Sequence, residues 1–97
     1  MMIVPVSLFA NTDFQIIRAK NYDYDIALKK EADGSYVALV LQCTHASNPL
    51  TFTGDKFNCS LHGSTFNEQG AVIHGPAEHP LKRLTTKISE NEIIVLL

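Results

Sequence analysis

Two short stretches of this chain each carry one cysteine and one histidine, residue types whose side chains bind transition metals. The first stretch is a C-x-H motif, and the second, after thirteen intervening residues, is a C-x-x-H motif. Both cysteines of the 97-residue chain and two of its four histidines fall within this pattern. Thiolate sulfur and imidazole nitrogen suit zinc and iron–sulfur centres. The candidate metal ligands are Cys43, His45, Cys59 and His62.

The two motifs are balanced, because each supplies one thiolate and one imidazole. A two-iron cluster could therefore take both thiolates on one iron and both imidazoles on the other. A structural zinc ion in a protein-binding module is the main alternative. Zinc ligands are typically spaced C-x₂₋₄-C and H-x₃₋₅-H, however, and C-x-H is tight for two ligands of one tetrahedral ion. A Cys43–Cys59 disulfide beside unrelated histidines and a chance coincidence are two further interpretations.

The elements that must position these motifs are short β-strands, since no stretch sustains the periodicity of a helix. Turn signals such as Asp33-Gly34 and Glu90-Asn91 separate them. The predicted strands are Ile3–Leu8, Phe14–Ala19, Tyr24–Lys29, Tyr36–Gln42, Thr51–Thr53, Lys56–Phe57, Ala71–Ile73, Leu84–Ile88 and Ile93–Leu97. The sequence therefore predicts one small all-β domain over residues 1–97, built from stacked antiparallel sheets. Three tyrosines are expected to pack these sheets, namely Tyr22, Tyr24 and Tyr36.

Charge and hydropathy exclude several kinds of partner. The net charge is −2 and the basic residues form no stripe, so we expect no nucleic-acid binding. No run approaches the about 20 apolar residues that span a bilayer, so we expect no membrane insertion by this chain itself. The apolar N-terminus is interpreted as a strand. We expect a soluble domain in the cytoplasm, or in the cell envelope or periplasm if an N-terminal anchor was removed.

The two motifs and the downstream Gly75-Pro76-Ala77 resemble the two cluster-binding boxes and the proline loop of Rieske [2Fe–2S] proteins. The resemblance spans roughly residues 37–97. It implies a Rieske-like domain of three stacked antiparallel sheets, with a cluster-binding subdomain at one tip over about residues 43–81. It also implies that Cys43 and Cys59 bind the buried iron, while His45 and His62 bind the outer iron near solvent.

The resemblance extends to residues around the cluster. Pro76 would lie in the loop that covers it, and Gly63 follows the second histidine. Ser64 matches the serine that donates a hydrogen bond to a cluster sulfide in the high-potential branch, found in cytochrome bc complexes. Phe66 stands where that branch has a tyrosine, so the ring is kept but its hydroxyl donor is absent.

Two departures from the bc branch point toward the small ferredoxin-type members that serve oxygenases. Asn48 and Leu61 replace the cysteines that form an inter-loop disulfide in that branch. The thirteen-residue spacer also leaves no room for the helix-bearing insertion of the bc proteins. The chain therefore mixes features of both groups.

The function that the resemblance implies is one-electron transfer, with no catalysis by this chain alone. It would serve as a soluble carrier or as a subunit of a respiratory-type or oxygenase chain. Because Ser64 adds one hydrogen bond and Phe66 adds none, we predict an intermediate potential, roughly 0 to +200 mV within the Rieske range. A redox partner would dock at the tip formed by His45 and His62. We expect a monomer unless the chain is part of a complex.

Overall fold

The computed structural model describes all residues from Met1 to Leu97 and is built almost wholly of strands. The elements are β1 (Met2–Pro5), the 3₁₀ turn η1 (Val6–Phe9), β2 (Phe14–Arg18), β3 (Asp25–Lys30), β4 (Tyr36–Val40), β5 (Thr51–Thr53), β6 (Lys56–Asn58), β7 (Thr65–Phe66), β8 (Val72–His74), β9 (Arg83–Ser89) and β10 (Glu92–Leu96). The predicted all-β class is confirmed. No helix is long and apolar enough to cross a membrane.

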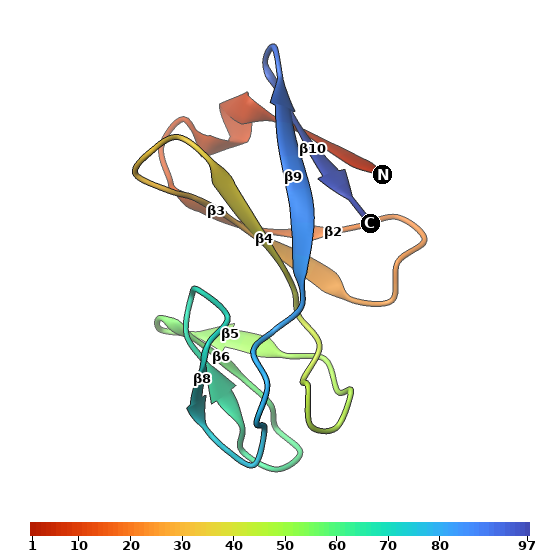
Figure 1. Cartoon of the computed structure of the whole chain (residues 1–97), viewed down its shortest axis with the longest axis vertical. Helices are drawn as coiled ribbons and strands as arrows, with labels where there is room; N and C mark the ends of the chain where they lie inside the picture. The colour runs from red at the N-terminus through yellow and green to blue at the C-terminus, as the bar shows by residue number, and fades with distance from the viewer.

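The strands form two bodies that lie one above the other in Figure 1. The upper body, called the base here, is a six-stranded antiparallel sheet in the order β1-β10-β9-β4-β3-β2. The lower body, called the tip here, is the part of the chain between β4 and β9 and contains a four-stranded sheet in the order β5-β6-β7-β8. The chain passes into the tip after β4 and returns from it into β9.

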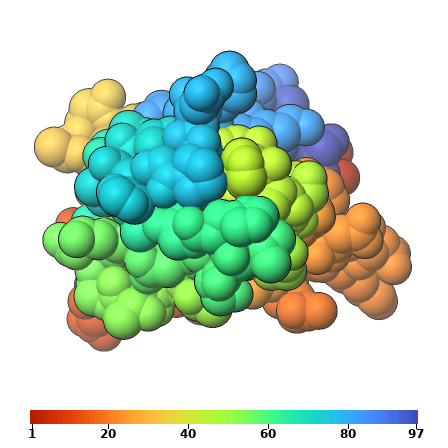
Figure 2. All heavy atoms as spheres, turned by 90° about the horizontal axis from the view of Figure 1, so that it is seen from below, coloured from red at the N-terminus to blue at the C-terminus, as the bar shows by residue number.

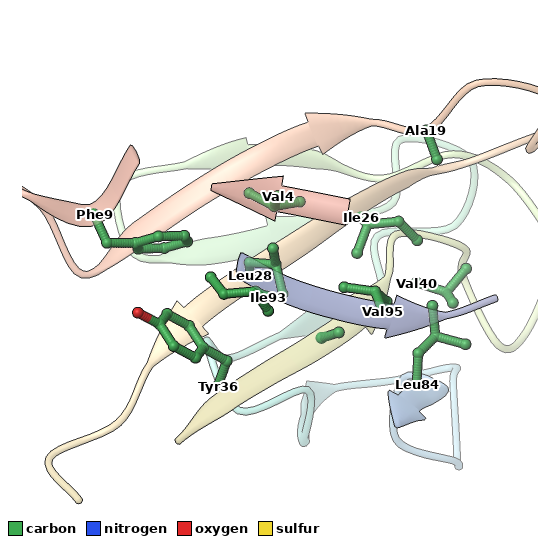
Figure 3. Close-up of a cluster of buried hydrophobic side chains, with 11 residues drawn as sticks. Val4, Phe9, Ala19, Ile26, Leu28, Tyr36, Val40, Leu84, Ile93 and Val95 are labelled. Atoms are coloured by element: carbon green, nitrogen blue, oxygen red, sulfur yellow. The ribbon is translucent and has the colours of Figure 1, made fainter. Parts of the chain in front are cut away.

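The base folds over on itself because β9 belongs to both of its layers. The first residues of β9 pair with β4, through Leu84 opposite Ala38, and its later residues pair with β10, through Ile88 opposite Ile93. Two of the three expected sheets are therefore joined through β9 into one continuous six-stranded sheet. Figure 3 shows the apolar side chains that fill the space between these layers.

Two hydrophobic cores lie along the length of the molecule. The base core contains Val4, Phe9, Ala19, Ile26, Leu28, Tyr36, Ala38, Val40, Leu84, Ile93 and Val95. The second core continues into the tip and contains Ala27, Leu39, Leu41, Cys43, Leu50, Phe57, Cys59, Phe66, Ala77 and Leu81. Both cysteines thus lie in an apolar environment that excludes water.

Side chains of the base and tip contact each other at their junction. The ring of Phe14 in β2 packs edge-on against Phe52 in β5, with ring centroids 4.7 Å apart. Arg83 Nη2 donates to the Gln69 carbonyl at 3.1 Å, and Lys29 Nζ lies 3.9 Å from a carboxylate oxygen of Glu68. The second hydrophobic core also joins base residues to tip residues, so apolar burial stabilises this junction more than the single ion pair does.

Two local elements differ from the sequence expectation. The second half of the first predicted strand is η1, in which Ala10 N–H donates to the Ser7 carbonyl at 3.2 Å, because the chain turns after Pro5 to reach β2. Strand β7 has no counterpart among the predicted strands. At two residues it is too short to display the alternation of apolar and polar positions by which strands are recognised.

The Asp33-Gly34 turn between β3 and β4 is confirmed. Gly34 adopts φ +89°, a conformation that residues with a side chain rarely enter. Asp33 accepts hydrogen bonds from the Ser35 hydroxyl at 2.6 Å and from the Ser35 N–H at 2.9 Å. The Ser35 side chain, and then its N–H, lower the pKa of the Asp33 carboxyl, because both stabilise the carboxylate.

Candidate metal centre

The first Cys/His loop (Cys43–Asn48) leaves the base just after β4. It is closed by two backbone hydrogen bonds: Ser47 N–H donates to the Cys43 carbonyl and Cys43 N–H donates to the Asn48 carbonyl, both at 2.8 Å. Ser47 adopts φ +57°, in the left-handed region. This closure places Cys43 at the buried end of the loop and His45 at its exposed end.

The second Cys/His loop (Cys59–Ser64) follows β6 and repeats the same backbone frame. Gly63 N–H donates to the Cys59 carbonyl at 3.1 Å, and Cys59 N–H donates to the Ser64 carbonyl at 2.8 Å. Gly63, with φ +80°, occupies the position that Ser47 takes in the first loop. The two loops are therefore equivalent in backbone geometry, although the histidine comes one residue later in the second.

The four candidate ligands lie as two pairs. The cysteines are 1% and 2% exposed and belong to the same buried cluster. The histidines are exposed, and the rings of His45 and His62 meet edge to face with centroids 5.1 Å apart. No three side chains of the types His, Cys, Asp and Glu gather where one metal ion could be held. The structure thus brings the predicted residues together as a buried sulfur pair and an exposed imidazole pair.

The surroundings of Cys43 stabilise a thiolate. Burial acts to raise the pKa of this thiol, but hydrogen bonds from the backbone N–H groups of Ala46 and His45 oppose it. The side chains of Cys59 and Ser64 add two more, and together these bonds lower the pKa of Cys43 below its ordinary value. A thiolate is the form of cysteine that binds metals. Two thiols in a dry core beside two accessible imidazoles therefore fit a [2Fe–2S] group with mixed ligands.

The proline loop (Gly75–Leu81) is held against both Cys/His loops. Ser64 is completely buried, and its hydroxyl accepts a hydrogen bond from Ala77 N–H at 3.0 Å. Thr44 Oγ1 in the first loop donates to the His79 carbonyl at 2.7 Å. Pro76 lies in this loop beside the buried Ala77. Figure 2 views the tip from below and shows the three loops gathered on one face.

The remaining predicted residue, Phe66, is fully buried and lies opposite Phe57 on the neighbouring strand. These two rings belong to the same buried cluster as both cysteines. Sequence reasoning missed two contacts of the first loop, the Thr44 bond to His79 and a bond from Tyr24 Oη to the Ser47 carbonyl at 2.8 Å. Their partners lie 35 and 23 residues apart, and no local pattern indicates them.

A small antiparallel β fold with two equivalent Cys/His loops over a dry core defines a class of iron–sulfur proteins. The Rieske [2Fe-2S] domain family matches residues 3–85, and the chain belongs to this family. Its cofactor is therefore a Rieske-type [2Fe–2S] cluster.

Known proteins of similar sequence and structure agree with this assignment. The chain is 32% identical over 75 residues to cytochrome b6-f complex iron-sulfur subunit 3 of Nostoc sp. PCC 7120, covering 72% of this chain and 40% of that protein. The plasma membrane Rieske protein PetC3 of Synechocystis PCC 6803 has the same fold, with a TM-score of 0.75 and 24% identity over the full length of both chains. A chain from the complex of oxygenase and ferredoxin in carbazole 1,9a-dioxygenase has a TM-score of 0.63 and 22% identity, covering 98% of this chain and 90% of that one.

Proposed function

We propose that this chain is a one-electron carrier in which Cys43 and Cys59 bind one iron and His45 and His62 bind the other. The observation that carries the proposal is the division of the four donors into a buried sulfur pair and an exposed imidazole pair. A two-iron cluster needs one pair for each iron, whereas a tetrahedral zinc ion needs all four donors around one centre. The paired arrangement therefore favours the cluster over the zinc module.

The bound cluster supplies the one-electron redox chemistry, and the chain controls its surroundings. Phe57 and Phe66, both 0% exposed, keep water from the sulfur pair. The backbone N–H groups of Ala46 and His45 and the Ser64 hydroxyl, as donors to the Cys43 sulfur, would favour the electron-rich state of the site and so raise its potential. With Ser64 present and no hydroxyl at Phe66, we propose an intermediate potential of roughly 0 to +200 mV.

We further propose that a redox partner docks on the tip at His45 and His62. Leu61 lies between the second cysteine and histidine and is 53% exposed, which leaves an apolar side chain beside the imidazoles. Neither Cys/His loop contains an acidic or basic residue other than its histidine. The two Cys/His loops themselves thus present an uncharged, partly apolar surface, which supports association in which their own electrostatic steering is weak.

An electron-transfer system of the cytochrome b6-f type is the partner system that the relatives favour. The chain spans only about 40% of the length of the curated relatives, so this role is proposed and not carried over. Ser64 lowers the pKa of Cys43, and a hydroxyl donor at this sulfur also favours a raised potential and hence this system over an oxygenase.

The proposal is tested by visible absorption and low-temperature EPR of anaerobically purified protein, oxidised and then dithionite-reduced. We expect a red-brown protein that bleaches on reduction, with a rhombic EPR signal of low average g and about two irons per chain. Redox titration of the same signal gives the potential. A colourless protein containing one zinc would contradict the proposal and support the protein-binding module.

Ser64→Ala is expected to lower the potential while the cluster is retained. A hydrogen bond to a charged group contributes about 1.5–3 kcal/mol, which for a one-electron couple is roughly 60–130 mV. Ser60→Ala is the matched control, because Ser60 is an exposed serine of the same loop. Equal potentials for the parent and Ser64→Ala would show that the Ser64 hydroxyl does not tune the site.

A further inference from the structure

The two Cys/His loops have the same backbone frame but fill its most constrained position differently. In the second loop this position is Gly63, at φ +80°, a conformation that glycine adopts without steric cost because it has no side chain. In the first loop it is Ser47, at φ +57°, and a residue with a Cβ enters this region at a cost. The first loop therefore needs support that the second loop does not.

Tyr24 supplies a contact that provides this support. Its hydroxyl donates to the Ser47 carbonyl at 2.8 Å, from the end of the loop that joins β2 to β3. The Tyr24 ring packs against the base core, so the donor is anchored on the base. In Figure 2 the orange β2–β3 loop lies beside the yellow-green first loop.

The bond acts on the turn from which His45 projects. Ser47 N–H closes the loop onto the Cys43 carbonyl, and His45 lies between these two residues. Fixing the Ser47 carbonyl fixes the Ser47–Asn48 peptide plane, beside the two bonds that close the loop, and so restricts the backbone of the turn that carries the imidazole. Ser47 is itself exposed, so water can replace the phenol if it is removed. The bond therefore matters for local geometry more than for folding.

We propose that Tyr24 is a positioning residue for the metal centre, holding the left-handed Ser47 turn and through it the orientation of His45. The inference rests on the proposed function, because it takes His45 as an iron ligand. The Tyr24 hydroxyl bonds to the Ser47 backbone and to no ligand side chain, so it acts on the centre only through Ser47.

The test is a double-mutant cycle on the cluster-loaded protein, comparing the parent, Tyr24→Phe, Ser47→Gly and the double variant. Tyr24→Phe should broaden or shift the EPR signal and speed the loss of iron to a chelator by about three- to tenfold, the factor set by one ordinary hydrogen bond. Ser47→Gly should restore the parent's EPR signal and iron-loss rate in the Tyr24→Phe background, because glycine adopts the turn unaided. Tyr22→Phe is the matched control, since Tyr22 is a half-buried tyrosine of the same loop whose side chain makes no hydrogen bond.

The possible outcomes separate this inference from the proposed function. A Tyr24→Phe spectrum and iron-loss rate equal to the parent's would overturn the inference. So would an impaired Tyr24→Phe variant that Ser47→Gly fails to rescue, since Tyr24 would then act through packing and not through the turn. A parent protein that takes up no iron would overturn the proposed function, and the inference would fall with it.

Discussion

Cys43→Ser and Cys59→Ser are each expected to abolish cluster binding completely. Both sulfurs lie in the tip core, at 1% and 2% exposure, and a serine hydroxyl there is neither a thiolate nor a soft ligand. Iron and sulfide content should fall to background, and the visible absorption and the reduced EPR signal should disappear. A variant that keeps about two irons per chain would show that the replaced cysteine is not a ligand.

The histidines provide an internal control for the same experiment. His45→Ala and His62→Ala are expected to lose the Rieske signal, because one iron would lack an imidazole. His74→Ala and His79→Ala remove the other two histidines of the chain, both exposed, and should retain the parent's cluster. His79 accepts the hydrogen bond from the first Cys/His loop through its backbone carbonyl, which alanine preserves. Loss of iron in either control would mean that the ligand set is wrong.

Loss of the cluster should also reduce stability, since a metal group bound only by the folded chain adds to its folding free energy. The effect should be concentrated in the tip, whose sheet has four strands of two or three residues each. The base has longer strands and a core of its own. Hydrogen exchange of the Cys43→Ser protein should therefore show faster exchange in the tip than in the base.

The amino-acid sequence is sufficient to predict features that are encoded locally. Each Cys/His motif is a contiguous stretch of chain, so residue types and spacing alone indicate the candidate ligands. The strands are predicted where apolar residues alternate, and Asp33-Gly34 marks a turn that the structure confirms. The pairing of β9 with both β4 and β10 is not predictable in this way, because it depends on contacts between strands distant in the chain.

The support of the site depends on contacts that no local pattern records. The Ser64 hydroxyl accepts from Ala77 N–H thirteen residues away, a bond that the serine's predicted role toward the cluster does not include. Tyr24 is expected from the sequence only to pack the sheets, and it does pack against the base core. Its hydroxyl nevertheless reaches the first Cys/His loop, because the fold places the β2–β3 connection beside that loop.

Gly70→Ala is expected to destabilise the cluster-loaded protein by roughly 2–4 kcal/mol, through overpacking and backbone strain together. Gly70 is buried where the tip meets the base, with φ +86°. A Cβ at this position would lie 2.9 Å from Leu39 Cδ2 and 3.4 Å from Leu81 Cβ. The backbone cannot easily move away, because Gly70 N–H donates to the Asn67 carbonyl and the Gly70 carbonyl accepts from Leu81 N–H. Thermal unfolding should shift down by more than roughly 10 °C.

Gly34→Ala separates the two causes of this loss. Gly34 has nearly the same φ, +89°, but an added Cβ there meets nothing within 4 Å. It should therefore cost about 1 kcal/mol, from backbone strain alone. Equal losses in the two variants would mean that contact with Leu39 contributes nothing. A further check is Leu39→Ala combined with Gly70→Ala. The combined loss should be smaller than the sum of the single losses, because shortening Leu39 makes room for the added Cβ at position 70.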